Sequence, residues 1–215
     1  MTLVVRDIGL CPYDKALALQ HELVERKLAG DRDDYLLLLE HPSVYTLGRG
    51  ADDADLQQAD RRLGIPAHRT GRGGGVTYHG PGQVIAYPIL ALQGTNRDVR
   101  GYVRRLEQVI IDACSALGVS AERIQGSPGV FAGGAKLASI GIGIRRWVTF
   151  HGLALNVSTD MSFFRAIVPC REPELRLTSL AQLLDPLPSD ASVKAALVGA
   201  FEDHFVAPIA LAEAS

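Results

Sequence analysis

Apolar residues recur at helical spacing early in the chain. The segment from Tyr13 to Leu28 directly follows Pro12. Its apolar positions include Leu17, Val24 and Leu28. A recurrence of three to four residues places such side chains on one face of a helix. We therefore predict an amphipathic helix over these residues.

Two further segments show helical signals. Between Asp98 and Leu117 an apolar stripe precedes Gly118, and glycine is the usual residue just beyond a helix end. Near the C-terminus, Pro188 precedes a segment that we expect to be helical to about Phe205, with Asp190 as its cap. The stripe of the central segment consists of Val99, Val103, Leu106, Val109, Ile110 and Ala113.

Strand patterns fill most of the remaining chain. Tyr35 to Glu40 is an apolar run that suits a buried strand, and Gly129 to Val157 is typical of consecutive hairpin strands. Hairpins among interleaved helices and strands indicate an α+β fold rather than a doubly wound one. We expect a single domain over residues 1–207, with a mixed, largely antiparallel sheet flanked by helices, and a disordered tail at 208–215. Other predicted strands lie at Leu3–Arg6, Val44–Leu47, Val119–Ile124 and within Val76–Ile89, which Gly80-Pro81-Gly82 interrupts. A short helix is also predicted at Asp53–Leu63.

Composition is that of an ordinary globular protein and argues against several functional classes. Of 215 residues, 47% are hydrophobic and 21% charged, which allows a sizeable core without metal or disulfides. Cys11, Cys114 and Cys170 form no even, short-spaced set, so a secreted disulfide framework is not expected. Without a secretory leader or an apolar run that could span a membrane, we expect a cytoplasmic protein. A formal net charge of −2 gives no nucleic-acid signature.

One local charge excess departs from this balanced average. Residues 97–105 carry four arginines and one aspartate, and Arg145-Arg146 add a further pair. A solvated helix face explains such a run, and so does a docking patch for an acidic partner. The sequence leaves both interpretations open.

The segment GRGGGVTYHGPGQ, Gly71 to Gln83, contains six glycines in thirteen residues. It lacks the Gly-Lys-Ser/Thr of a phosphate-binding P-loop and the third glycine of a dinucleotide fingerprint. A flexible linker would be polar, whereas Val76 lies within the segment and Val84 and Ile85 follow it. We favour a structured loop and strand whose backbone a ligand approaches closely. A purely structural set of turns is the alternative.

The segment AKLASIGIGIRRW indicates a second surface with few side chains. Three isoleucines alternate with two glycines in residues 140–144, so one face of a strand would carry isoleucines and the other almost nothing. Such a bare face can be the floor of a ligand groove. A bulge, or a helix packed closely on the glycines, would explain the same pattern.

Cys170 and Lys136 are candidates for nucleophilic chemistry. Cys170 lies in IVPCRE, and its thiol would need a positive neighbour, because a thiol with a pKa of about 8.5 is only slightly ionised at pH 7. Lys136 opens the isoleucine–glycine strand and could hold a thiolate or exchange protons with an amine. A buried inert cysteine and a solvated lysine are the alternatives. His79 and His151 suit either a Cys-His dyad or structural hydrogen bonds. No metal-ligand spacing occurs, and we expect no metal.

Three segments together resemble the lipoate-protein octanoyltransferase family. They are RGGGVTYHGPGQVIAYPIL, GGAKLASIGIGIRRWVTFHGLALNV and IVPC, which occur in the family's order and spacing. Each glycine cluster alone is a weak signal, whereas the ordered set with Lys136 and Cys170 in place is specific. The matching segments span about Tyr35 to Leu183. The implied fold is that of the biotin and lipoate protein ligase catalytic domain.

The resemblance implies an acyltransferase that acts in two steps and needs no cofactor. An octanoyl group would pass from octanoyl-acyl carrier protein to Cys170 as a thioester, and then to a lysine of a lipoyl domain, with Lys136 assisting. The acceptors would be lipoyl domains of 2-oxoacid dehydrogenase E2 subunits and the glycine cleavage H protein. We expect a monomer that binds neither nucleic acid nor membrane. The implied substrate-binding residues are Arg72, Gly73, Gly74, Gly75, Val76, Thr77, Tyr78, His79, Ser139, Ile140, Gly141, Gly152, Leu153 and Ala154.

The sequence departs from the family's pattern directly after Cys170. The family usually has glycine at that position, whereas this chain has Arg171. An arginine there changes the expected backbone geometry near an oxyanion. It could also depress the pKa of the thiol or obstruct the acyl group.

Three other functions fit the same residues. An ATP-dependent lipoate or biotin ligase has a related fold, activates a free acid as an adenylate and does not need Cys170. A non-catalytic module that binds carrier or lipoyl domains would form no covalent adduct. A cysteine hydrolase would release free octanoate.

Overall fold

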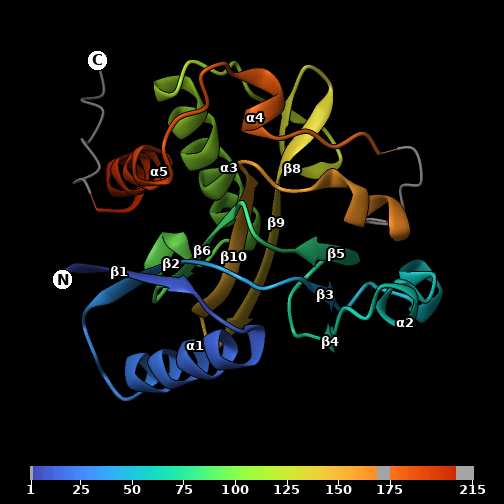
Figure 1. The fold of residues 1–215 in the computed structure, drawn as a ribbon. Helices are drawn as coiled ribbons and strands as arrows, with labels where there is room; N and C mark the ends of the chain where they lie inside the picture. Colours follow the sequence, from blue (N-terminus) through green and yellow to red (C-terminus); the bar gives the residue numbers. More distant parts are fainter. Residues whose placement is uncertain (1, 169–174, 207–215) are drawn as a thin grey trace.

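The computed structural model describes residues 2–168 and 175–206. Cys170, Arg171 and the predicted tail at 208–215 therefore lie outside the described residues. Within the described part of the chain, the strands form one large and one small sheet, and helices cover both faces of the large sheet (Figure 1).

The large sheet has seven strands in the order β1-β2-β6-β10-β9-β8-β7. The first pair, β1 and β2, is parallel, and the other neighbouring pairs of described strands are antiparallel. The prediction of an α+β fold with a mixed, largely antiparallel sheet is confirmed. The strands are β1 (Leu3–Leu10), β2 (Asp34–Glu40), β6 (Gln83–Ile89), β7 (Glu122–Ile124), β8 (Ser127–Ala132), β9 (Ala135–Arg145) and β10 (Val148–Asn156).

The small sheet explains the break predicted within Val76–Ile89. It contains β3 (Val44–Leu47) between the parallel β4 (Ala67–Arg69) and the antiparallel β5 (Val76–His79). β5 therefore belongs to the small sheet, whereas β6 belongs to the large one. Gly82, with a φ of 78°, lies in the turn between them, in the left-handed region that glycine tolerates best. The glycine-rich turn is thus the corner where the chain leaves one sheet for the other.

Helices on the two faces bury opposite sides of the same strands. Leu36 and Leu38 of β2 belong to the core under α3 and α5, whereas Leu37 and Leu39 belong to the core under α1. This explains why the β2 segment is continuously apolar rather than alternating. The helices are α1 (Tyr13–Leu28), α2 (Ala59–Leu63), α3 (Val99–Ala116), α4 (Leu180–Leu183) and α5 (Asp190–Phe205), with 3-10 turns η1 (Asp53–Leu56), η2 (Gly94–Asn96) and η3 (Met161–Ala166).

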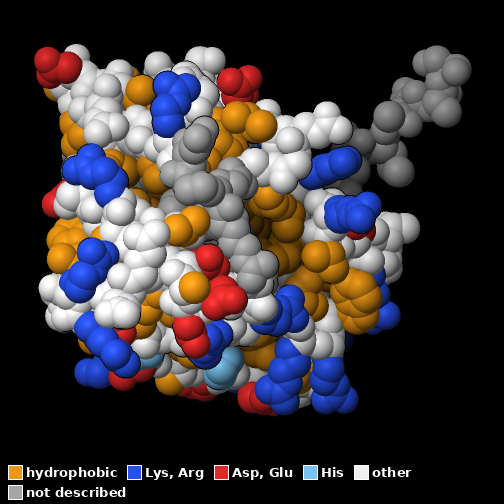
Figure 2. Space-filling model, turned by 90° about the vertical axis from the view of Figure 1, so that its right-hand side faces the viewer, with side chains coloured by type: hydrophobic (Ala, Val, Ile, Leu, Met, Phe, Trp, Pro, Cys, Tyr) orange, Lys and Arg blue, Asp and Glu red, His pale blue; other side chains and the backbone are white. Residues whose placement is uncertain are grey.

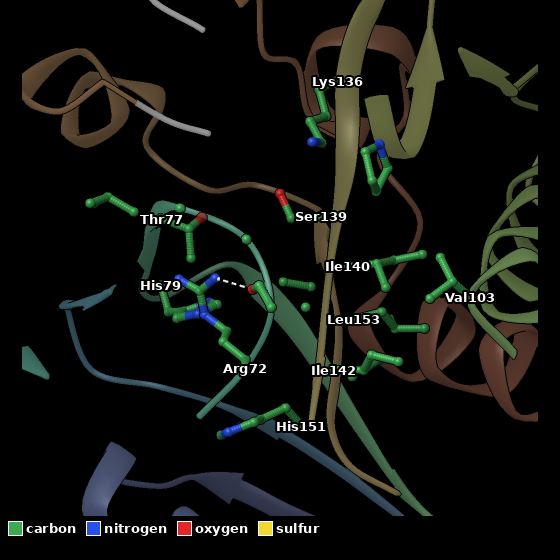
Figure 3. A pocket seen from close by; sticks show the side chains of 18 of the residues that line it. Arg72, Thr77, His79, Val103, Lys136, Ser139, Ile140, Ile142, His151 and Leu153 are labelled. Carbon is green, nitrogen blue, oxygen red and sulfur yellow. Dashed lines mark hydrogen bonds between the residues drawn. The ribbon is translucent and has the colours of Figure 1, made fainter. Parts of the chain in front are cut away.

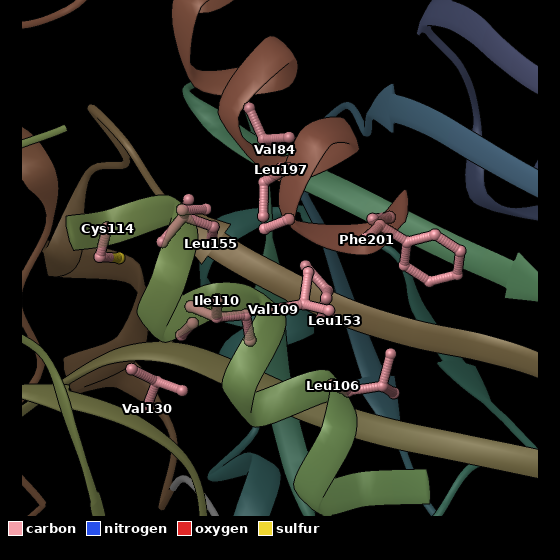
Figure 4. Close-up of a cluster of buried hydrophobic side chains, with 14 of the residues drawn as sticks. Val84, Leu106, Val109, Ile110, Cys114, Val130, Leu153, Leu155, Leu197 and Phe201 are labelled. Carbon is pink, nitrogen blue, oxygen red and sulfur yellow. The ribbon is translucent and has the colours of Figure 1, made fainter. Parts of the chain in front are cut away.

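The α3 stripe packs as the sequence predicts. Leu106, Val109 and Ile110 are almost completely buried, and they lie against Leu153 and Leu155 of β10 (Figure 4). Each fully buried leucine or valine contributes about 1.5–3 kcal/mol to folding. The helix therefore holds β10 in place, and β10 carries part of the site described below.

Two local predictions are wrong in detail. The cap of α5 is Ser189, whose Oγ accepts a hydrogen bond from Ser192 N at 3.2 Å, and Asp190 is the first helical residue. The predicted helix at 53–63 is split into η1 and α2, because Gln57 and Gln58 adopt left-handed conformations with φ of 50° and 56°. A helix cannot continue through two such residues.

Candidate active site

A cavity of about 420 Å³ lies between the glycine segment and strands β9 and β10. This volume is in the range of small-molecule binding sites. All of the predicted substrate-binding residues except Tyr78 line the cavity, and so does Lys136. Segments that are far apart in the sequence therefore meet at one place (Figure 3). Cys170, the predicted nucleophile, lies outside the described residues.

Tyr78 does not line the cavity, because its side chain points to the other face of β5. Thr77 and His79 line the cavity, and alternate strand residues face opposite sides. The Tyr78 ring stacks on Phe163 with ring centroids 4.8 Å apart, and its hydroxyl lies 2.9 Å from Ser43 Oγ. Tyr78 is thus part of the core beside the small sheet and not of the cavity wall.

Several cavity walls were missing from the predicted set. Tyr13 of α1, Tyr87 of β6 and Val103 of α3 line the cavity, as do Gly126 in the turn before β8 and the first two residues of β8, Ser127 and Pro128. In the sequence, Tyr13 and Val103 read as ordinary positions of amphipathic helices. Only the tertiary packing of α1 and α3 brings them to the glycine segment. His151, noted in the sequence only as an alternative dyad residue, is also a wall.

The glycine segment is an ordered loop that lies directly on β9. Gly73 N donates a hydrogen bond to Ile142 O at 2.9 Å, and Gly74 has a φ of 87°, which favours glycine. A Cβ added at Gly141 would lie 3.0 Å from Arg72 Cδ and 3.2 Å from Gly73 O. Glycine at 141 therefore allows the close approach, and the linker interpretation is excluded.

The bare face of β9 is narrower than the alternating pattern predicts. At Gly141 the surface borders the cavity, whereas at Gly143 the ring of Phe150 covers the backbone. Phe150 is the cross-strand neighbour of Gly143 in the pairing of β9 with β10. The two glycines thus have different roles, and only Gly141 forms a wall of the cavity.

Arg72 anchors the glycine loop to the small sheet. Its side chain is buried, and Nη2 donates to Thr46 O at 2.6 Å and to Thr46 Oγ1 at 2.8 Å. Nε donates to the same hydroxyl at 3.1 Å, and Nη1 donates to Gly73 O at 3.0 Å. A buried guanidinium needs such partners, because an uncompensated charge in the interior is costly. Arg72 therefore fixes the loop and supplies positive charge beside the cavity.

A chain of hydrogen bonds leads from Thr46 to the peptide of Thr178. His79 Nδ1 lies 2.7 Å from Gln83 Oε1, and Gln83 Nε2 donates to Asn156 Oδ1 at 2.9 Å. Asn156 Nδ2 then donates to Thr178 O at 3.1 Å. Because Gln83 Oε1 can only accept, His79 carries its proton on Nδ1, and Nε2 accepts from Thr46 Oγ1 at 3.3 Å.

The buried histidines around the cavity are neutral. Burial lowers the pKa of His151 to about 3 and that of His41 to about 4, and it lowers the pKa of His79 well below its ordinary value. His151 lies within β10 with a φ of 56°, and its backbone N donates to Gln20 Oε1 at 2.7 Å. A non-glycine residue held in this conformation stores strain, which is common at functional sites.

Lys136 is buried, and its side chain and that of the partly exposed Ser139 lie on the side of β9 that faces the glycine segment (Figure 3). Phe131 of β8 pairs with Lys136, whereas Val130 pairs with Ala138, so β9 contains one extra residue there. Such a bulge changes the alternation of a strand and redirects side chains. It allows Lys136 and Ser139, three positions apart, to face the same way.

The backbone of Lys136 is tied to the segment that follows residue 174. Lys136 N donates to Arg176 O at 2.7 Å, and Thr178 N donates to Lys136 O at 3.0 Å. Thr178 O is also the end of the hydrogen-bond chain through Asn156. The position of Lys136 is therefore coupled to the wall that contains His79.

The two described cysteines are poor nucleophiles. Cys114 lies in the core under α3, where burial raises its pKa to about 12. Burial also raises the pKa of Cys11. Among the described residues, no three His, Cys, Asp or Glu side chains cluster so that they could hold a metal ion. No helix in the same part of the chain is long and apolar enough to cross a membrane.

Comparisons with known proteins agree with this architecture. The model of the lipoyl protein ligase A/B catalytic domain matches residues 12–202. An octanoyltransferase of Solibacter usitatus is 50% identical over 169 residues, which is 77% of each chain. An octanoyltransferase of Geobacter metallireducens is 42% identical over 200 residues, 93% of this chain and 92% of the relative. A putative lipoate protein ligase of T. acidophilum has a similar fold, with a TM-score of 0.74 and 18% identity over 94% of this chain and 84% of that one.

Proposed function

The chain belongs to the lipoyl protein ligase A/B catalytic domain family, and we propose that it is an octanoyltransferase of protein lipoylation. The donor is octanoyl-acyl carrier protein, and the acceptors are lysines of lipoyl domains in 2-oxoacid dehydrogenase E2 subunits and in the glycine cleavage H protein. The observation that carries the proposal is one cavity that combines buried Lys136 with a wall of bare glycine backbone.

The glycine wall suits an acyl chain because it offers a smooth surface with few competing polar groups. His79 uses both ring nitrogens in hydrogen bonds, and Arg72 is bound to Thr46. An octanoyl chain can lie along Gly141 and Gly152 below the glycine loop. Each CH₂ group that leaves water there contributes about 0.8 kcal/mol.

In the first step the thiolate of Cys170 attacks the carbonyl carbon of the donor thioester. A new carbon–sulfur bond forms, the bond to the carrier's sulfur breaks, and the carrier leaves as a thiol after it gains a proton. One thioester replaces another, so no external energy source is required. We assign to Lys136 the tasks of holding the thiolate and exchanging protons.

In the second step the acceptor's lysine amine attacks the enzyme thioester. A carbon–nitrogen bond forms, the carbon–sulfur bond breaks, and the proton released by the amine passes through Lys136 as Cys170 leaves. The amide product is more stable than the thioester, which drives transfer forward. Backbone N–H groups of the glycine loop can stabilise the oxyanion in both steps. Arg171 adds a positive charge next to Cys170 in the sequence.

Intact-protein mass spectrometry after incubation with octanoyl-acyl carrier protein tests the proposal. We expect an octanoyl-sized mass increase that hydroxylamine removes and that the Cys170→Ser variant does not show. An increase that persists in this variant would place the nucleophile elsewhere. Release of free octanoate without transfer to a lipoyl domain would indicate a hydrolase.

The structural likeness to lipoate protein ligases shows a shared fold and makes an ATP-dependent ligase the second candidate. Such an enzyme would modify the lipoyl domain from free octanoate and ATP, and Cys170→Ser would retain that activity. A binding module would form no covalent product with either donor. Parallel reactions with the two donors therefore separate these functions.

A further inference from the structure

The cavity has two arms, one on each side of β9. Lys136, Ser139 and the glycine loop lie on one side, whereas Val103, Ile140 and Leu153 lie on the other (Figure 3). We call the second part the α3 arm, and Gly126 with the start of β8, Ser127 and Pro128, completes its wall. The transfer steps described above use only the first side, and the predicted substrate-binding residues Ile140 and Leu153 do not say which part of the donor the α3 arm holds.

The backbone edge of β9 is open beside the α3 arm. β8 pairs with β9 only as far as Ala138, and among the described residues the next bond on this edge is from Gly73 N to Ile142 O. Alternate residues of a strand direct N–H and C=O toward the same edge. Ile140 therefore directs both groups away from β10, in the same direction as Ala138 and Ile142. An amide in the cavity could pair with them as a neighbouring strand would.

Ser127 adds a second polar group to this apolar arm. Its Oγ is buried and has no hydrogen-bond partner within the described residues, although the residue lines the cavity. Buried hydroxyls are nearly always hydrogen-bonded, because an unsatisfied one loses its interaction with water. The hydroxyl and the Ile140 edge together suit an extended, amide-containing ligand.

Arginines lie near this arm on α3 and β7. Arg100 and Arg104 are exposed on α3, three residues before and one residue after Val103. Arg123 Nη2 donates to Arg104 O at 2.8 Å, which brings β7 and the following turn next to them. The other two arginines of the basic stretch stack on rings, Arg97 over Trp147 and Arg105 over Phe205. Arg100 and Arg104 have no such ring contact among the described residues, and both lie within one helical turn of the cavity residue Val103.

We propose that the α3 arm binds the phosphopantetheine arm of the acyl donor; this inference rests on the proposed function. The acyl chain lies along the glycine wall, and the thioester lies near Lys136. One pantetheine amide pairs with the backbone of Ile140 and bonds to Ser127 Oγ, and the phosphate meets Arg100 and Arg104. The acidic carrier protein then lies over the N-terminal half of α3. Figure 2 shows a different part of the surface, the side of the small sheet, where hydrophobic side chains lie in a hollow with Lys and Arg side chains around it.

Truncated donors test the amide contacts. Transfer to a lipoyl domain is measured with octanoyl-pantetheine and with S-ethyl octanethioate, which has no amide. For the wild type we take the ratio of kcat/KM for octanoyl-pantetheine to kcat/KM for S-ethyl octanethioate. We expect Ser127→Ala to lower this ratio by about three- to tenfold, as for the loss of one buried hydrogen bond. An unchanged ratio in a folded variant would overturn the assignment of Ser127.

Val103→Phe tests which arm holds which part of the donor. If the α3 arm holds pantetheine, KM for octanoyl-pantetheine rises about tenfold while the preference among hexanoyl, octanoyl and decanoyl donors is retained. A shift of that preference toward shorter acyl chains would place the acyl group in this arm and overturn the proposal. Val99→Phe is the matched control, because Val99 is exposed on the same helix and does not line the cavity.

The phosphate contact is tested by comparing octanoyl-phosphopantetheine with octanoyl-pantetheine. The Arg100→Ala/Arg104→Ala double variant should lose the advantage of the phosphorylated donor, whereas Arg61→Ala on α2 should keep it. Calorimetry with octanoyl-phosphopantetheine provides a readout that is independent of turnover, and equal affinities for the double variant and the wild type would overturn the contact. Binding without any transfer would instead contradict the proposed function alone.

Discussion

Replacing Asn156 by aspartate tests the hydrogen-bond chain below the cavity. Asn156 is 2% exposed, its Nδ2 donates to Thr178 O at 3.1 Å, and its Oδ1 accepts from Gln83 Nε2 at 2.9 Å. Aspartate has the same shape and keeps the acceptor for Gln83. It replaces the donor by an oxygen that faces the carbonyl oxygen of Thr178, so one interaction becomes repulsive.

The size of the effect follows from the burial of this position. Loss of the donor leaves Thr178 O unsatisfied, which costs about 1–3 kcal/mol. Burial and the facing carbonyl also raise the pKa of the new carboxyl above its unfolded value, and each unit of that shift costs about 1.4 kcal/mol at pH 7. The folded state then binds more protons than the unfolded state. The variant is therefore least stable at neutral pH and regains stability as the pH falls through the folded-state pKa.

Urea unfolding at pH 7 and pH 5 measures this difference. We expect Asn156→Asp to lose at least about 2 kcal/mol at pH 7 relative to the wild type, and to recover part of the loss at pH 5, where a protonated carboxyl can donate to Thr178 O. Asn96→Asp on the exposed η2 turn is the control for the added charge. If the two variants showed the same pH dependence, the orientation of the Asn156 amide, and with it the Nδ1 tautomer of His79, would be wrong.

Three further predictions address the site directly. Lys136→Ala should lower the rate of octanoyl transfer about 10²- to 10⁴-fold in a steady-state assay. Lys15→Ala, on the exposed side of α1, should have no effect. Comparable rates for both variants would remove Lys136 from the mechanism. Gly141→Ala should lower the free energy of unfolding in denaturant by about 1–3 kcal/mol, because the added Cβ meets Arg72 and Gly73. Gly199→Ala, whose added Cβ has no atom within 4 Å, should instead raise it by about 0.5–1 kcal/mol. Burial lowers the pKa of His151 from 6.5 to about 3, so the unfolded state binds more protons than the folded state below pH 6.5. This residue therefore lowers the free energy of unfolding by up to about 1.4 kcal/mol per pH unit as the pH falls toward 3. His151→Asn should therefore reduce acid sensitivity in circular dichroism, and His21→Asn at an exposed position should not; equal acid midpoints would show that His151 is not buried as described.

The sequence was most informative where local chemistry decides the structure. The α1 segment was predicted with its observed bounds, because a proline start and an apolar stripe are local signals. The hairpins of β8 to β10 were also predicted from their pattern. The split between η1 and α2 was missed, because Gln57 and Gln58 adopt left-handed conformations and no glycine at these positions signals them in the sequence.

Part of the cavity wall was predicted because it also has a local signal in the sequence. The glycine loop and Gly141 were found because glycine density has few explanations other than close backbone approach. Tyr13, Tyr87 and Val103 gave no such signal, since a tyrosine or valine in an amphipathic element is usually core. Tyr78 belongs to the same motif but does not line the cavity, because the motif does not show which residues of β5 face it.

By itself, the sequence determined the longer helices and most strands, the fold class and the segments that carry chemistry, because periodicity and glycine spacing act over a few residues. Only the tertiary structure decided which faces meet. It placed β5 and β6 in different sheets and used a bulge to turn Lys136 toward the glycine wall. It also left the edge of β9 open beside Ser127. These features depend on strand pairing between distant segments, and no local pattern specifies that pairing.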